Sequence, residues 1–164
     1  MAITNTYQQY LKESSRTFKV ADHMLSVTYP LVKDTKLLLV VLENLHFSLT
    51  NAVSALVYHE RYYKRLPPFQ EAFDSQFNMF MMKCAPNYRI ENSQIQLVQD
   101  IQSLICEHKK SPVEFIKQDK FVICSDDYKI NALTMEEIKS YLLKTKIFID
   151  NIQNIITKNE RSTP

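Results

Sequence analysis

The first part of the chain carries apolar residues at alternating steps of four and three, which keeps side chains on one face of an α-helix. This stripe runs from about Asn5 to Thr28 and consists of Tyr7, Leu11, Ser14, Phe18, Ala21, Leu25 and Thr28. Ser14 interrupts the apolar series, and Thr28 closes it. Pro30 follows, and a proline ring disfavours continuation of a helix. The pattern predicts a first helix over about 5–28.

A second stripe occupies the stretch from Lys33 to Leu66, which contains no proline, and Asp34 or Thr35 can cap its start. Its members are Leu38, Leu42, Leu45, Leu49, Ala52, Leu56, His59 and Tyr63. Near its start this helix is apolar nearly all round. Such a helix is either central to a bundle or half-buried in a partner, so we expect it to be the core helix.

Two further helices are predicted after Pro67 and Pro68, which end the second one. The third helix is aromatic and extends to Pro86. One side of it is formed by Phe69, Phe73, Phe77, Phe80, Met81 and Cys84. Ser93 and Gln96 have the spacing of a capping box, which opens a fourth helix. Its seam consists of Leu97, Ile101, Leu104 and His108.

The stretch from Ser111 to Leu133 carries two different patterns. Ser111, Pro112 and Glu114 can supply the N-cap, first-turn proline and third-position acid of a short helix. Phe121 to Cys124 is instead β-prone. We expect one or two helical turns here and then an extended segment that lies across the bundle.

Thr134 and Glu137 form a second capping box, which opens the last helix. Its seam is Ile138, Leu142, Thr145, Ile149, Ile152 and Ile156, and a polar tail covers 158–164. The predicted fold is therefore all-α. It is an up-and-down bundle of four main helices with a shorter additional helix and an irregular or extended crossover near 115–133. We expect one helical-bundle domain over 1–164.

The composition excludes several classes of function. No glycine occurs among the 164 residues, where the usual share would give roughly 11. This argues against phosphate-cradling loops, the nucleophile elbow of hydrolases and primed hairpin turns, which depend on glycine. The net charge of +2 does not indicate a general polyanion-binding surface. The longest wholly apolar run, Leu37 to Leu42, is too short to span a bilayer, and no basic-then-apolar leader opens the chain. We expect a cytoplasmic protein without membrane association or cofactor.

The sequence offers little support for a metal site. Glu43 and His46 form a Glu-x-x-His pair, the spacing with which di-metal helical bundles present two ligands from one turn. Such bundles need a second pair, which this sequence lacks, so we predict no metal and a hydrogen-bonded role for His46. Cys84, Cys106 and Cys124 are widely spaced and form no CxxC pair, which favours packing over metal binding.

The densest aromatic and basic cluster of the chain extends from Tyr58 to Arg65. Aromatic rings can stack on unpaired bases while cations hold phosphates, so Arg61, Tyr62, Lys64 and Arg65 are candidate RNA or phosphate contacts. The alternative is structural, because cations also favour helix C-termini.

The order of predicted elements resembles the HEPN superfamily of helical bundles. The resemblance is clearest over "SPVEFIKQDKFVICSDDYKINALTMEEIKSYLLKTKIFIDNI", where an extended stretch leads into the closing helix. It implies a dimeric domain that is often RNA-cleaving or nucleotide-binding, with many catalytically silent relatives. The chain also resembles uncharacterised archaeal helical proteins, which implies no function.

The nuclease signature of the HEPN superfamily is an Arg and a His separated by four to six residues. At the corresponding late position this chain has Lys117 and Lys120, so the motif is not matched. Arg16 and His23 meet the spacing, but they lie in the first helix and opposite its apolar stripe. They are the only catalytic candidates, and we interpret them as a solvated pair, which leaves an enzymatic function uncertain.

These observations favour a non-catalytic helical binding or assembly module that self-associates or binds a protein partner. Leu37, Val40 and Val41, together with apolar surface between Phe69 and Met81, are the predicted partner interface. The alternative is a HEPN-like RNA-binding or ribonuclease domain of toxin type. A small-ligand pocket between helices, lined by Phe and Tyr residues, is a third interpretation.

Overall fold

The computed structural model describes the backbone of residues 2–110, 113–117, 120–124 and 130–162, and the side chains of 6–107 and 134–161. It confirms the predicted all-α bundle. The long helices are α1 (Ala2–His23), α3 (Lys36–Tyr62), α6 (Asn92–Lys110) and α7 (Met135–Ser162). Shorter elements are the π-helical η1 (Met24–Thr28) and η2 (Phe80–Cys84), with α2 (Tyr29–Val32), α4 (Phe73–Met79) and α5 (Ala85–Tyr88).

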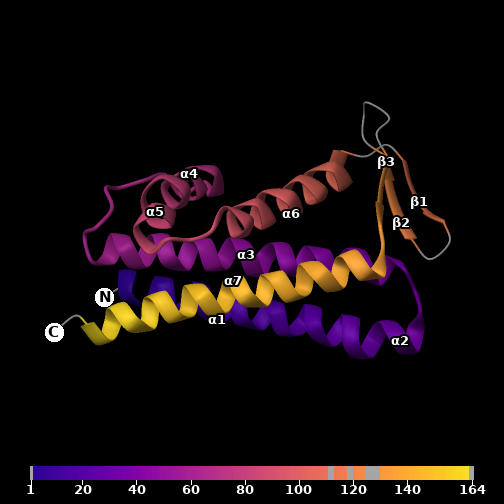
Figure 1. Cartoon of the computed structure of the whole chain (residues 1–164), viewed down its shortest axis with the longest axis horizontal. Coiled ribbons are helices and arrows are strands. Elements are labelled where there is room, and N and C mark those ends of the chain that lie inside the picture. The colour runs from indigo at the N-terminus through magenta and orange to yellow at the C-terminus, as the bar shows by residue number, and fades with distance from the viewer. Residues whose placement is uncertain (1, 111–112, 118–119, 125–129, 163–164) are drawn as a thin grey trace.

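Helix α3 lies at the centre of the bundle. In Figure 1 α1 and α7 run along one side of it, and the segment from α4 to α6 covers the other. Its seam supplies much of the core, with Leu38, Leu42, Leu45, Leu49 and Leu56 all buried. By length and composition α3 is apolar enough to cross a membrane, but half of its most apolar window is buried inside this structure. The position is that of a core helix, as the sequence predicts.

Two of the four prolines that the sequence predicts to end helices do not do so. Pro30 lies in the first turn of α2 and Pro86 in the first turn of α5. A five-residue π-helical segment precedes each, η1 before α2 and η2 before α5. A proline inside a helix removes one backbone hydrogen bond and crowds the carbonyl four residues earlier, and a local π-helical widening relieves both problems. The helical path therefore continues through each proline.

The helices end instead at residues with positive φ. Lys33 (φ 55°) and Arg89 (φ 54°) are the left-handed C-caps of α2 and α5, and Lys64 (φ 59°) follows the end of α3. Glycine normally takes such positions because it has no Cβ to clash. Here lysine and arginine take them. Backbone hydrogen bonds hold the caps, such as Lys33 N–H to the Tyr29 carbonyl at 2.7 Å.

The predicted caps have mixed outcomes. Thr134 and Glu137 form the predicted capping box, with the Glu137 N–H donating to Thr134 Oγ1 at 3.1 Å. Thr35 is the N-cap residue of α3 but makes no side-chain cap hydrogen bond, and Asp34, one residue earlier, accepts from the Lys36 N–H at 3.0 Å. The Ser93 capping box is wrong, because α6 already begins at Asn92 and the Ser93 hydroxyl donates to Glu91 instead.

The predicted extended crossover forms a three-stranded antiparallel sheet, β1 (Val113–Lys117), β2 (Lys120–Cys124) and β3 (Ile130–Leu133). Figure 1 places it at the end of the bundle where α6 finishes and α7 starts. The short helix expected near Glu114 is wrong, since Glu114 pairs with Ile123 in the first ladder. Ser111 and Pro112, its expected cap and first-turn proline, lie outside the described residues. The β-branched and aromatic composition of these segments favours pairing over helix.

Candidate functional site

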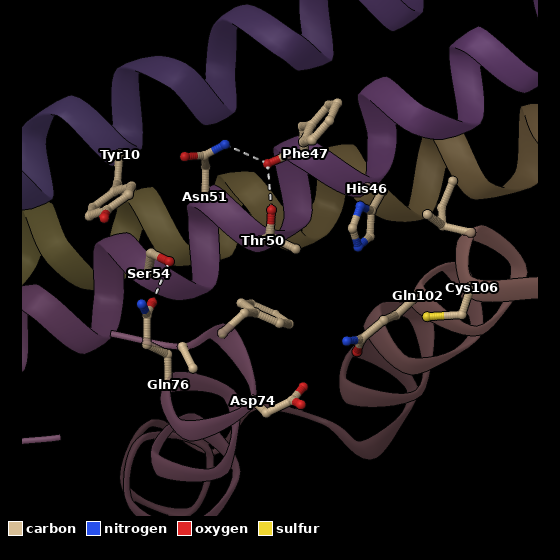
Figure 2. Close-up of a pocket in the computed structure, with 13 residues that line it drawn as sticks. Tyr10, His46, Phe47, Thr50, Asn51, Ser54, Asp74, Gln76, Gln102 and Cys106 are labelled. Carbon is tan, nitrogen blue, oxygen red and sulfur yellow. Dashed lines mark hydrogen bonds between the residues drawn. The ribbon is translucent and has the colours of Figure 1, made fainter. Parts of the chain in front are cut away.

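A pocket of about 470 Å³ opens between α3, the start of α4 and α6. Helix α1 adds Tyr10 to its wall. The lining residues are Tyr10, His46, Phe47, Thr50, Asn51, Ser54, Ala72, Phe73, Asp74, Gln76, Gln102, Ile105 and Cys106. Figure 2 shows His46 of α3, Gln102 of α6 and Asp74 of α4 directed toward the same open space. Pockets of this size that combine apolar walls with a few convergent polar groups are typical small-molecule sites.

The α3 wall of the pocket is a line of polar residues on an otherwise apolar helix. His46, Thr50 and Ser54 are four residues apart, so they lie one above the other on one face. The Thr50 hydroxyl donates to the Phe47 carbonyl at 3.1 Å. Asn51 donates to the same carbonyl at 2.7 Å. These bonds fix the polar side chains along the helix.

The floor of the pocket is a buried hydrogen-bonded pair. The Ser54 hydroxyl donates to Gln76 Oε1, and both residues are buried. Gln76 Nε2 in turn donates to the Glu71 carbonyl at 2.7 Å. This pair ties α3 to the start of α4, so the floor is a fixed part of the fold (Figure 2).

Aromatic rings form the remaining walls, and neighbours outside the pocket hold two of them. Tyr10 stacks on Tyr58 with ring centroids 5.3 Å apart, and Phe73 stacks on Phe77 at 5.7 Å. Phe47 is also a lining residue and is 53% exposed, but Figure 2 shows its ring on the side of α3 away from Asp74 and Gln102.

The described lining of the pocket carries little formal charge. Among the lining residues that the structure describes, Asp74 carries the only formal charge when His46 is neutral. Across the described part of the chain no group of three or more His, Cys, Asp or Glu side chains could hold a metal ion. Cys106 is an exposed thiol in the pocket wall, whereas burial raises the pKa of the Cys84 thiol to about 12.

A second polar cluster lies where α3 ends against α5 and α7. The carboxylate of Glu60, which is only 2% exposed, accepts from the Tyr88 hydroxyl and from Arg65 Nη1 at 3.0 Å. Asn159 donates to the Tyr88 oxygen at 2.7 Å. Burial opposes the charge, but hydrogen bonds from His59 and Tyr88 and the charge of Arg65 outweigh it. The pKa of Glu60 therefore lies below its usual value.

The same cluster extends to the N-terminal helix. The Tyr7 hydroxyl donates to Glu160 Oε1 at 2.7 Å, and the Tyr7 ring meets His59 edge-on at 4.9 Å. Burial, with the Glu160 hydrogen bond, raises the pKa of Tyr7. These contacts join α1, α3 and α7, so the cluster holds the three helices together at this end of the bundle.

Two of the RNA-contact candidates are engaged inside the chain. Arg65 pairs with Glu60, and its guanidinium also lies 5.1 Å from the Tyr63 ring centroid. The Arg61 guanidinium lies 5.2 Å from the centroid of Phe69. Tyr62 and Lys64 are exposed.

The catalytic candidates do not form a shared site. Arg16 pairs with Glu13 at 2.9 Å on the exposed side of α1. His23 is exposed near the end of the same helix. Six residues lie between the two, which places them about 10 Å apart along the helix axis. His46 lies in the pocket wall, and its Glu-x-x-His partner Glu43 is not among the lining residues.

The predicted partner interface needs correction. Val41 is fully buried in the chain's own core, and Leu37 and Val40 are only partly exposed. The core takes up this face because α3 lies at the centre of the bundle. Phe77 and Phe80 are likewise buried in the core. Large apolar side chains that are exposed occur elsewhere, at Val27, Leu31, Val32, Phe47, Met82, Leu143 and Ile147.

The sequence analysis offers a pocket between helices lined by Phe and Tyr residues, but it misses the polar residues of this one. Asp74, Gln102 and Thr50 carry no motif, and they come from three separate helices. The available signal was the four-residue spacing of His46, Thr50 and Ser54 in an apolar helix. A polar line on a core helix needs either partners or a cavity.

Comparison of the chain with protein-family models, with curated proteins and with solved structures finds no match in any of the three. Functional inference for this chain therefore depends on its own geometry.

Proposed function

We propose that this protein is a non-catalytic binding module and that the pocket between α3, α4 and α6 is its binding site. The observation that carries the proposal is the convergence of His46, Asp74 and Gln102 on one open space with aromatic walls (Figure 2). The buried Ser54–Gln76 pair supports it, because a fixed floor lowers the cost of ordering the site when a ligand enters.

The experiment equilibrates the purified protein with the small-molecule fraction of its native cells and detects retained compounds by native mass spectrometry. Gln102→Trp fills the pocket from α6 and is expected to abolish retention. Gln96→Trp is the matched control, because Gln96 is an exposed residue of the same helix outside the pocket. Equal retention by the Gln102→Trp and Gln96→Trp proteins, or no retention by the wild type, would contradict the proposal.

Self-association is a second candidate, favoured by two residues of α7. Leu143 and Ile147 are 64% and 60% exposed and lie one helical turn apart. Lys146 and Asp150 form an ion pair at 3.1 Å beside them. Antiparallel pairing of α7 with a second copy would set Leu143 of one copy against Ile147 of the other. Sedimentation of Ile147→Lys against wild type tests this, with a dimer in the wild type alone as the expected result.

A further inference from the structure

We propose that the pocket selects a small organic ammonium ion with a flat apolar body, such as an aryl-alkyl amine. This inference rests on the proposed function and adds the chemical class of the ligand. Three features of the lining residues carry it: their charge, their spare hydrogen-bonding atoms and their rings.

The charge of the pocket favours a cation. Asp74 is exposed at the start of α4 and directed into the open space in Figure 2. Among the lining residues whose side chains the structure describes, none is Lys or Arg. When His46 is neutral, an anion would therefore face a carboxylate with no described cation in the lining to offset it, although the chain as a whole carries a net charge of +2. The pocket is locally acidic on a weakly basic protein.

Three oxygen atoms of the pocket are left with acceptor capacity alone, and these favour a ligand that carries donors. The Thr50 hydroxyl donates its only proton to the Phe47 carbonyl, and the Ser54 hydroxyl donates its own to Gln76 Oε1. Each hydroxyl then has only lone pairs left to offer, and an ionised Asp74 carboxylate is likewise an acceptor only. An ammonium group brings donors and no acceptor, which matches these three oxygens.

The rings favour a flat body beside that charge. Tyr10 and Phe73 contribute aromatic surface to the walls. Their π faces attract a cation within about 6 Å and also stack on flat apolar groups. Because Tyr10 and Phe73 are each held by an outside ring, they lose little freedom when a ligand enters.

Three probes with one indole ring separate the contributions of charge and shape. Tryptamine carries an ammonium group, indole-3-propionate carries a carboxylate on a chain of the same length, and 3-ethylindole is neutral. Binding to the isotope-labelled full chain is followed by backbone amide NMR and by protection of Cys106 from alkylation. Tryptamine is expected to bind roughly tenfold more tightly than 3-ethylindole, and indole-3-propionate more weakly than either.

Asp74→Asn is expected to remove the roughly tenfold preference for tryptamine while 3-ethylindole binds as before. Asp100→Asn is the matched control, because it makes the same charge change at an exposed position of α6 outside the pocket. Gln102→Lys places a cation in the pocket and is expected to reverse the preference toward indole-3-propionate. The amide spectrum of each variant confirms that it is folded.

The outcomes separate this inference from the proposed function. If 3-ethylindole or indole-3-propionate binds the wild type as tightly as tryptamine, the ammonium inference is overturned and the binding pocket stands. If Asp74→Asn and Asp100→Asn weaken tryptamine binding equally, the preference for tryptamine is a general charge effect. The ammonium inference is then overturned. If no probe shifts the amides of pocket residues or protects Cys106, both proposals are overturned.

Discussion

Ser14 and Ser48 exchange hydrogen bonds across the interface between α1 and α3. The Ser14 hydroxyl donates to the Ser48 carbonyl at 2.7 Å, and the Ser48 hydroxyl donates to the Ser14 carbonyl at the same distance. Both residues are fully buried. Ser14 interrupts the apolar stripe in the sequence because a small polar residue is needed where the two helix backbones approach closely.

Replacing Ser48 by alanine is expected to lower the free energy of unfolding by about 1 kcal/mol, the net value of one neutral hydrogen bond. Ser48→Leu is expected to lower the free energy of unfolding further, by about 2–3 kcal/mol in total, because the leucine side chain overpacks the close helix contact. Urea denaturation measures both. Ser103→Ala, at an exposed position of α6, is the control and should change stability little. A Ser48→Leu protein as stable as wild type would show that the helices are not closely packed there.

The left-handed residues predict sites where glycine stabilises the fold. Arg89→Gly is expected to raise the free energy of unfolding by about 0.5–1 kcal/mol, since arginine at φ 54° has a Cβ clash that glycine lacks. The greater entropy that glycine gives the unfolded chain limits the gain. Lys36→Gly, in the first turn of α3, provides the opposite control and should be destabilising. If the midpoint of thermal unfolding shifted in the same direction for Arg89→Gly and Lys36→Gly, the left-handed conformation assigned to Arg89 would be contradicted.

Two of the cysteines are expected to differ in reactivity. Cys106 is exposed in the pocket wall, while Cys84 is buried with a pKa of about 12, raised by burial first and the charge of Glu60 second. Because the thiolate is the nucleophile, iodoacetamide should modify Cys106 well before Cys84 in the folded protein. Peptide mass spectrometry over a time course measures the order. If iodoacetamide modified Cys84 as fast in the native state as in urea, the burial of Cys84 would be contradicted.

The helices were predictable because burying one side of a helix leaves a pattern in the sequence. The stripe containing Leu38, Leu42 and Leu45 and the capping box at Thr134 are local, so spacing alone reveals them. The continuation of helix through Pro30 was not predictable in this way. A π-helical turn accommodates that proline, and the choice depends on packing rather than on the residues alone.

The pocket depends on contacts that sequence spacing does not encode. Thr50 and Asp74 are brought together only because α4 packs on α3, and Gln102 joins them from α6. The Ser54–Gln76 hydrogen bond that forms the floor spans 22 residues. Val41 shows the converse error. Its place beside the seam predicts a surface residue, and the central position of α3 buries it instead.

The buried carboxylate of Glu60 predicts a specific loss of stability in acid. Its folded pKa lies below the unfolded value, so the stabilisation is fully present above the unfolded pKa of about 4.3. It is lost as pH falls through the folded pKa. Glu60→Gln removes this titration, so its free energy of unfolding should vary less with pH below about pH 5 than that of the wild type.

At neutral pH, Glu60→Gln should be less stable than wild type by about 2 kcal/mol, because the charged bonds from Arg65 and Tyr88 are weakened while both residues remain in place. The difference in free energy of unfolding between the wild type and Glu60→Gln should become smaller as the pH is lowered. Glu71→Gln, an exposed carboxylate, is the control and should keep the acid response of the wild type. Urea denaturation across pH 3–7 measures all three proteins. Parallel curves for wild type and Glu60→Gln would show that the carboxyl is not ionised in the folded cluster, and Tyr88 would then accept its proton rather than donate one.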